Sequence, residues 1–233
     1  MVNRKLFAAL VYQSMGFSVI PVGPDKKPYV KCKKFQSERA SRNQIRQWWQ
    51  TFPDANIAIM CGAVSGIDVI DVDSEEALEI LNGFLPKLFT TLVAITPNGC
   101  HFYFKHQKGL SNRVKVLNDS DIRTTGGYII APPSRNEKGK VYSWLDCFNI
   151  KSFSIASMPD SLYQAIAKGS GTNIARTKQK PLTLEPVKTG SIKTTLARLV
   201  GRWINQGTDF ETAYITAKGW KSELQEPLED KEV

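Results

Sequence analysis

Two aspartates, Asp71 and Asp73, lie two residues apart in the run GIDVIDVD, whose other residues are mostly apolar and typical of a buried strand. Side chains alternate between the faces of a strand, so both carboxylates point to one face. Two like charges on one face repel, and a cation between them would relieve the repulsion. Clustered oxygen ligands select hard divalent ions, which predicts Mg²⁺ or Mn²⁺ here. A solvated strand end would carry the same residues.

A histidine, His101, begins a second strand pattern, CHFYF, directly after the turn PNG. Tight turns free backbone N–H groups to face an anion, and an imidazole beside them can bind or protonate a phosphate. Taken alone, a histidine at a strand start more often has a structural role. His106 lies in a polar turn and Asp68 on the face opposite Asp71, so neither is given a role.

A third polar group follows in the segment SDIRTTGGYIIAPPS, where Asp121 and Arg123 are two residues apart and share one strand face. An acid beside an arginine fits a further metal ligand next to a phosphate clamp. A plain surface salt bridge would use the same two residues. The Gly126–Gly127 pair allows another group to approach the backbone closely.

The charge of the chain is uneven. The 233 residues carry a net charge of +9, and residues 1–50 hold ten lysines or arginines against two acids. A basic block of this kind favours a polyanionic partner, most commonly nucleic acid. Four cysteines without a CxxC pair, and only two histidines, do not favour a structural zinc site.

Periodicity and turn residues predict an α+β fold in which the strands are mostly antiparallel. Helices are expected at 3–15 (ending at Gly16), 43–52 (capped by Ser41), 75–82 (closed by Gly83) and 158–168. Strands are expected at 17–22, 56–62, 67–73, 91–96, 100–104 and 140–145, with one more strand within 121–134 and a basic loop at 23–35.

The domain organisation is predicted from composition. Residues 1–167 form the main domain, residues 168–190, rich in Gly, Pro, Thr and Lys, form a linker, and residues 191–233 form a helical module. Two helices bury little core alone, so we expect that they dock elsewhere or that the chain continues. No apolar stretch is long enough to cross a membrane, and the first helix lacks a cleavage site, so the expected location is the cytoplasm.

Four patterns in order, GFSVIPVGPDKKP, IRQWWQTFPDANIAIMCGAVSGIDVIDVD, TPNGCHFYF and DIRTTGGYIIAPPSRNEKGKVYSW, resemble the bifunctional DNA primase/polymerase (prim-pol) domain of the archaeo-eukaryotic primase superfamily. The resemblance covers roughly residues 3–165. It implies an RRM-like catalytic sheet with an N-terminal α/β lobe, and a setting in plasmid or phage replication. The tail looks like the start of the small helical module that follows such domains, with Ile192 and Lys193 where the family usually has Arg-Asn.

The resemblance also assigns residues by position. The family's D-x-D/E motif falls on Asp71 and Asp73, and its lone acid falls on Asp121, so these three are the expected catalytic metal ligands. Its small-x-His motif falls on Gly99, Cys100 and His101. Because the family often has serine where this chain has Gly99, a backbone N–H is expected to replace the hydroxyl there.

The resemblance implies template-directed nucleotidyl transfer on single-stranded DNA with dNTPs or NTPs, and the residues it assigns fit a two-metal mechanism. His101 is expected to contact the incoming triphosphate, and Arg123, Lys27 and Lys31 are further phosphate-binding candidates. Trp48 and Trp49 could follow a template strand, but their helix must bury a face, which favours a place in the core. A helicase in the same or an associated chain is a further expected partner.

Two alternatives keep part of this evidence. A replication-initiation nuclease would use the same metals but usually needs a tyrosine near paired histidines, whereas His101 and His106 differ in strand parity. A non-catalytic nucleic-acid-binding module would use aromatic residues of the sheet for stacking. Phe102 and Phe104 share one face, but such a module has no use for three inward acids.

Overall fold

The computed structural model describes residues 3–85, 91–145 and 155–168. The elements follow one another as α1 (Arg4–Ser14), β1 (Ser18–Val22), the 3₁₀ helix η1 (Lys33–Gln36), α2 (Arg42–Thr51), β2 (Asn56–Met60), β3 (Ile67–Val72), α3 (Glu75–Phe84), β4 (Val93–Ile95), β5 (Cys100–Lys105), β6 (Ser120–Arg123), β7 (Tyr128–Ala131), β8 (Ser143–Trp144) and α4 (Asp160–Ala167).

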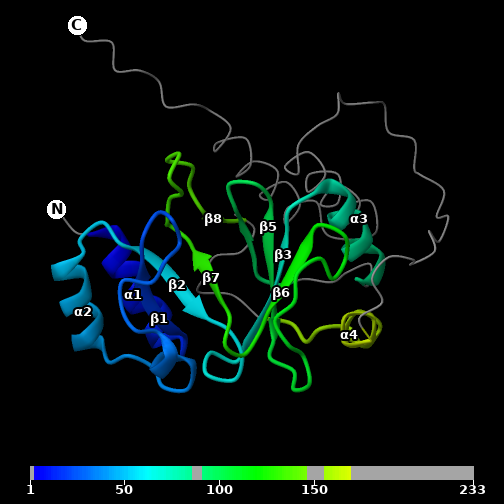
Figure 1. Cartoon of the computed structure of the whole chain (residues 1–233), viewed down its shortest axis with the longest axis horizontal. Helices are drawn as coiled ribbons and strands as arrows, with labels where there is room; N and C mark the ends of the chain where they lie inside the picture. The colour runs from blue at the N-terminus through cyan, green and yellow to red at the C-terminus, as the bar shows by residue number, and fades with distance from the viewer. Residues whose placement is uncertain (1–2, 86–90, 146–154, 169–233) are drawn as a thin grey trace, which may run out of the picture.

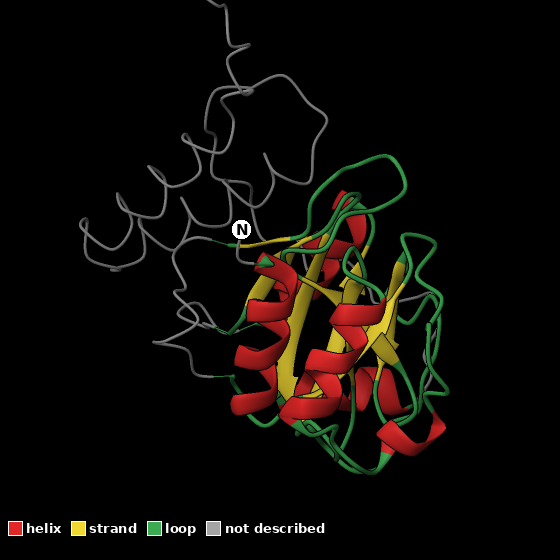
Figure 2. Cartoon of the chain, turned by 90° about the vertical axis from the view of Figure 1, so that its left-hand side faces the viewer, coloured by secondary structure: helices red, strands yellow, loops and turns green. Residues whose placement is uncertain are grey.

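The strands form two antiparallel sheets (Figure 1). The smaller sheet has the order β1-β2-β7 and packs with α1 and α2, which form the N-terminal lobe and lie in front of the strands in Figure 2. The larger sheet has the order β6-β3-β5-β4-β8, and one of its faces is covered by α3 and α4. Helices and antiparallel sheets mixed in this way confirm the predicted α+β class.

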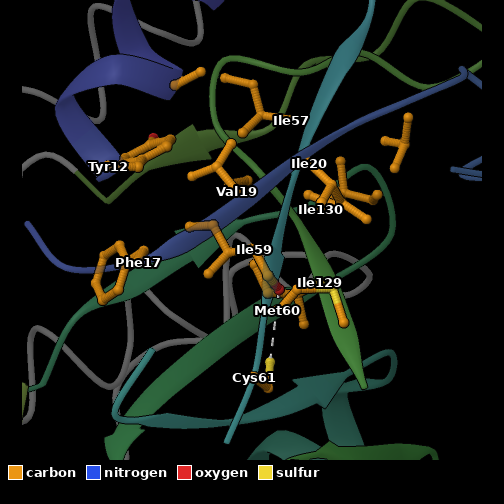
Figure 3. Close-up of a cluster of buried hydrophobic side chains, with 14 of the residues drawn as sticks. Tyr12, Phe17, Val19, Ile20, Ile57, Ile59, Met60, Cys61, Ile129 and Ile130 are labelled. Atoms are coloured by element: carbon orange, nitrogen blue, oxygen red, sulfur yellow. Dashed lines mark hydrogen bonds between the residues drawn. The ribbon is translucent and has the colours of Figure 1, made fainter. Parts of the chain in front are cut away.

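The main hydrophobic core lies between the two sheets and under α1 and α2. Tyr12 and Phe17 pack there with branched residues of β1, β2 and β7 (Figure 3). The Tyr12 hydroxyl donates a hydrogen bond to the Pro132 carbonyl over 2.6 Å and accepts one from Trp144 Nε1 over 3.0 Å. Because Tyr12 joins the N-terminal lobe to β8, the two sheets are held together around a satisfied polar group.

Side-chain caps begin three of the helices where the sequence predicts a start. The Ser41 hydroxyl accepts the N–H of Gln44, and the Ser74 hydroxyl accepts the N–H of Ala77. Asn3 accepts two N–H groups at the start of α1. Such a cap stabilises a helix by roughly 1 kcal/mol, because the first N–H groups have no partner within the helix.

Three expectations about the elements were wrong in detail. Helix α3 continues through Phe84, because Gly83 does not take the left-handed backbone conformation that would end it. The segment 121–134 holds two strands that belong to different sheets, β6 and β7, because the turn containing Gly126 (φ 86°) carries the chain from one sheet to the other. The basic loop contains the short helix η1.

Most of the expectations about the domains concern residues that the structure does not describe. Almost all of the predicted linker and the whole of the helical module at 191–233 lie outside the described residues. Helix α4 ends at Ala167, and the boundary there stays a prediction. Within the part of the chain that the structure describes, no helix is long and apolar enough to cross a membrane.

Candidate active site between the two sheets

Strand pairing brings the predicted acids and histidine into one row across the larger sheet. Asp71 of β3 lies opposite His101 of β5 on one side and opposite Asp121 of β6 on the other. Directly paired residues of neighbouring strands point to the same face, so all three side chains share the face that looks toward the N-terminal lobe. Asp73 follows just past β3, where its N–H donates to the Asp119 carbonyl over 2.9 Å.

A cleft of about 540 Å³ opens at this end of the sheet. Asp71, Asp73 and His101 line it together with Arg123. Lys26, from the loop after β1, and residues of β7 also line the cleft. The full set of other residues that line the cleft is Lys26, Thr96, Pro97, Asn98, Asn112, Gly126, Gly127, Tyr128, Ile129, Ile130, Asn136 and Tyr142.

An ion-pair contact in the cleft joins His101 to Asp71. His101 Nε2 lies 3.3 Å from Asp71 Oδ1, and the imidazole is only 3 % exposed. Burial alone would raise the pKa of Asp71, but His101, and more weakly Lys26 and Arg123, stabilise its charge, and the pKa ends below its ordinary value. Asp71 is therefore a carboxylate at neutral pH, and His101 is placed to orient it.

Asp73 lies in the opposite electrostatic situation. Burial raises its pKa, and the negative charges of Asp71 and Asp121 raise it further. His101 and Lys26 lower the pKa of Asp73, but by less, so it stays above its ordinary value. Burial raises the pKa of the Tyr142 hydroxyl to about 12, and the negative charges of Asp71 and Asp73 contribute to that rise. Negative charge therefore accumulates at this end of the cleft, as expected for a place that takes a cation.

The donor set suits a hard divalent ion. Asp71 Oδ1 is buried and accepts no hydrogen bond from any described residue, its contact with His101 falling outside hydrogen-bond geometry. A cation would satisfy this oxygen. Among residues 3–85, 91–145 and 155–168, however, no three acidic, histidine or cysteine side chains are gathered closely enough to hold a metal ion. The arrangement thus assembles the Asp71–Asp73 pair, with Asp121 beside it.

Asp121 is engaged by its own neighbours. Its Oδ2 lies 2.7 Å from Arg123 Nη2, and its Oδ1 accepts the N–H of Lys115 over 3.0 Å. The salt bridge that the sequence allowed as an alternative is thus present. Metal ligation by Asp121 would require a partial exchange of these contacts, while Arg123 still lines the cleft.

Gly99 has a role in shape that the sequence did not reveal. Its N–H donates to Thr96 Oγ1 over 2.8 Å, and its carbonyl accepts the N–H of Thr96 over 2.9 Å. The N–H expected to face a phosphate is thus already used within the turn. A Cβ at this position would run into the Val72 carbonyl, so a glycine lets the turn before His101 approach the end of β3 closely.

The basic loop contributes a different lysine from the two predicted. Lys27 is 84 % exposed and pairs with Asp25 over 3.3 Å, and neither Lys27 nor Lys31 is among the described residues lining the cleft. Lys26 lines it instead. Sequence reasoning could not choose among adjacent lysines in a loop. Sequence reasoning also missed Tyr142 as a residue that lines the cleft. The signal available was strand alternation in VYSWL, which places Tyr142 on the same face as Trp144.

The aromatic residues considered for nucleic-acid contact are in the core. Trp49 is buried, which confirms its expected core position, and Trp48 is partly buried and packs edge-on against Phe35. Phe102 and Phe104 are buried beneath α3 and α4. His106 lies beyond the far end of β5 from His101, where its Nδ1 is 2.9 Å from the fully buried Asp68.

The opposite pKa directions of the two aspartates predict opposite effects on stability. A lowered folded-state pKa means that Asp71 stabilises the fold at neutral pH, and this contribution is lost as the pH falls through that pKa. Asp71→Asn should therefore lower the Tm by roughly 2–8 °C at pH 7, from a loss of about 1–2 kcal/mol, with a smaller deficit near pH 3. The charge of Asp73 costs stability above the ordinary carboxyl pKa, so Asp73→Asn should leave the Tm unchanged or slightly raised. Thermal unfolding of both variants at the two pH values without added metal checks this, and equal shifts would contradict it.

Comparison with known proteins identifies a family. No curated protein matched the chain. A family model described as bifunctional DNA primase/polymerase, N-terminal, matches residues 9–161, which is more than half of the chain and includes every residue of the row Asp121–Asp71–His101. The chain therefore belongs to the family of bifunctional DNA primase/polymerase N-terminal domains.

Proposed function

We propose that this protein synthesises and extends primers on single-stranded DNA by template-directed nucleotidyl transfer. The observation that carries the proposal is the Asp71–Asp73 pair, held beside His101 in a cleft between two sheets, in a chain whose family is named for primase and polymerase activity. The family implies DNA and nucleotides as substrates. Plasmid- or phage-type replication, and a helicase in the same or an associated chain, are the setting we propose for it.

Asp71 and Asp73 are the residues that would hold Mg²⁺ or Mn²⁺, with Asp121 as the third candidate. When bound, the divalent ions would lower the pKa of the attacking 3′-hydroxyl and neutralise charge on the triphosphate. Asp71 brings a carboxylate that is charged at neutral pH and lies 3.3 Å from His101 Nε2. Asp73 brings a carboxylate whose pKa is raised by burial and by the charges of Asp71 and Asp121, which a bound cation would offset.

His101 and Arg123 complete the proposed nucleotide site. His101 lines the cleft, and its contact with Asp71 lets one imidazole touch both the metal-binding carboxylate and a bound phosphate. Arg123 presents its guanidinium to the cleft while it is anchored on Asp121. The role of Gly99 in this site is to keep the turn before His101 close to β3.

Two observations disfavour the alternatives. A stacking platform needs exposed aromatic residues, but Phe102 and Phe104 are covered by helices, and Tyr103 on the other face is fully buried. A replication-initiation nuclease usually needs two histidines close together, but His106 forms an ion pair with Asp68 and lies away from His101.

A 5′-labelled primer on a longer DNA template separates the three functions. With Mg²⁺ or Mn²⁺ and dNTPs or NTPs, we expect stepwise lengthening of the primer that a chelator abolishes. Shortening of either strand would indicate a nuclease. Binding of the template with no change in primer length would support a binding module and would overturn the proposal.

A further inference from the structure

Lys26 projects from the N-terminal lobe into the cleft that the acids line from the larger sheet. It is one of two cationic side chains among the described residues that line this cleft, the other being Arg123. Its positive charge helps to lower the pKa of Asp71 and partly opposes the rise in the pKa of Asp73, although its ammonium forms no ion pair with either. Lys26 is thus near the acidic end of the cleft but across open space from it.

The backbone of Lys26 is held in an unusual conformation by several contacts. Its φ is 68°, in the left-handed region that few residues other than glycine adopt. Its N–H donates to the Gly23 carbonyl over 3.0 Å, and its carbonyl accepts the Tyr128 hydroxyl over 3.1 Å. Tyr128 itself lines the cleft. A strained turn fixed to the wall of a cleft is a feature found at ligand-binding sites.

Three nearby cations already have an acidic partner. Arg123 pairs with Asp121, Lys27 pairs with Asp25, and Lys34 pairs with Glu38. Lys26 has no ion pair with any residue that the structure describes. Its charge is therefore available to an anionic ligand in the cleft without breaking an existing contact.

We propose that Lys26 binds the triphosphate of the incoming nucleotide from the N-terminal lobe, opposite the carboxylate pair. This inference rests on the proposed function and adds a binding residue to it. A nucleoside triphosphate carries more negative charge than a monophosphate. The lysine ammonium is a compact positive charge on a flexible side chain, so it attracts the triphosphate more strongly. Lys26 thereby selects triphosphates over nucleotides with shorter phosphate chains.

Equilibrium dialysis with labelled dATP, ATP, dAMP and AMP in the presence of Mg²⁺ tests the proposal directly. Lys26→Gln should weaken triphosphate binding about tenfold, the loss expected for one charge-assisted contact, and monophosphate binding less than twofold. Lys26→Arg should remain within about threefold of the wild type. Lys34→Ala, on the same basic segment and ion-paired with Glu38, should bind like the wild type.

The outcomes separate this inference from the function on which it rests. Triphosphate binding that is equal in wild type and Lys26→Gln would overturn the role of Lys26 and leave the proposed function standing. A wild type that binds no nucleotide would overturn both. Nucleotide binding that depends on Lys26, in a protein that never lengthens a primer, would support the inference and contradict the proposed function.

Discussion

Asp73→Asn should reduce nucleotide incorporation by roughly a thousandfold while the protein keeps its stability. The amide keeps the size of the carboxylate but removes the negative charge on which a divalent ion depends, so transition-state stabilisation is lost. The raised pKa of Asp73 shows that its charge is a cost to the metal-free fold, and a residue that costs stability at a cleft is expected to serve function. Steady-state incorporation into a primed template at saturating metal, with the Tm measured on the same sample, checks both parts.

Asp119→Asn is the matched control for this substitution. Asp119 is exposed, and its carbonyl accepts the N–H of Asp73, but its side chain does not line the cleft. Removing its charge should change incorporation less than threefold. If Asp73→Asn retained more than about a tenth of the wild-type rate, the assignment of Asp73 as a metal ligand would be wrong.

Gly99→Ala should be strongly damaging, because the turn before β5 leaves no room for a methyl group. The added Cβ meets the backbone carbonyl of Val72, which cannot rotate away as a side chain could. Relieving the clash would push the turn before His101 away from the end of β3, at a cost of about 1–3 kcal/mol and a Tm loss of roughly 2–12 °C. Because the displaced segments carry His101 and Asp73, incorporation should fall further than the loss of folded protein explains.

Gly83→Ala provides the corresponding control. Gly83 lies in α3 with open space where a Cβ would go, so alanine should stabilise the protein by about 0.5–1 kcal/mol through its higher helix propensity. Thermal unfolding and incorporation assays on the two variants test the contrast. A Gly99→Ala protein with wild-type stability and activity would show that the turn accommodates a side chain.

Strand alternation was sufficient to predict which residues share a face. Asp71 and Asp73 point together because they are two residues apart, and the same rule placed Asp68 on the opposite face, where it is buried against His106. Alternation does not give register between strands. The row Asp121–Asp71–His101 therefore depended on the family resemblance until the pairing of β3 with β5 and β6 was known.

The features that sequence reasoning missed come from contacts between distant segments. Lys26 was one of several lysines in a loop, and its place in the cleft follows from the packing of that loop against Tyr128. The constraint on Gly99 arises from the Val72 backbone, 27 positions earlier in the chain. Residues 121–134 form two strands because β6 joins the larger sheet and β7 the smaller one. The choice of sheet depends on distant partner strands, so the local sequence pattern does not reveal it.

Primer synthesis on unprimed single-stranded DNA tests the central claim most directly. Wild type, Asp73→Asn and Asp119→Asn would be compared with labelled dNTPs or NTPs and either Mg²⁺ or Mn²⁺. The structure and the proposed chemistry predict metal-dependent oligomers from the wild type and from Asp119→Asn, and none from Asp73→Asn. Oligomers of equal yield from all three proteins would contradict the claim that the Asp71–Asp73 pair is the catalytic centre.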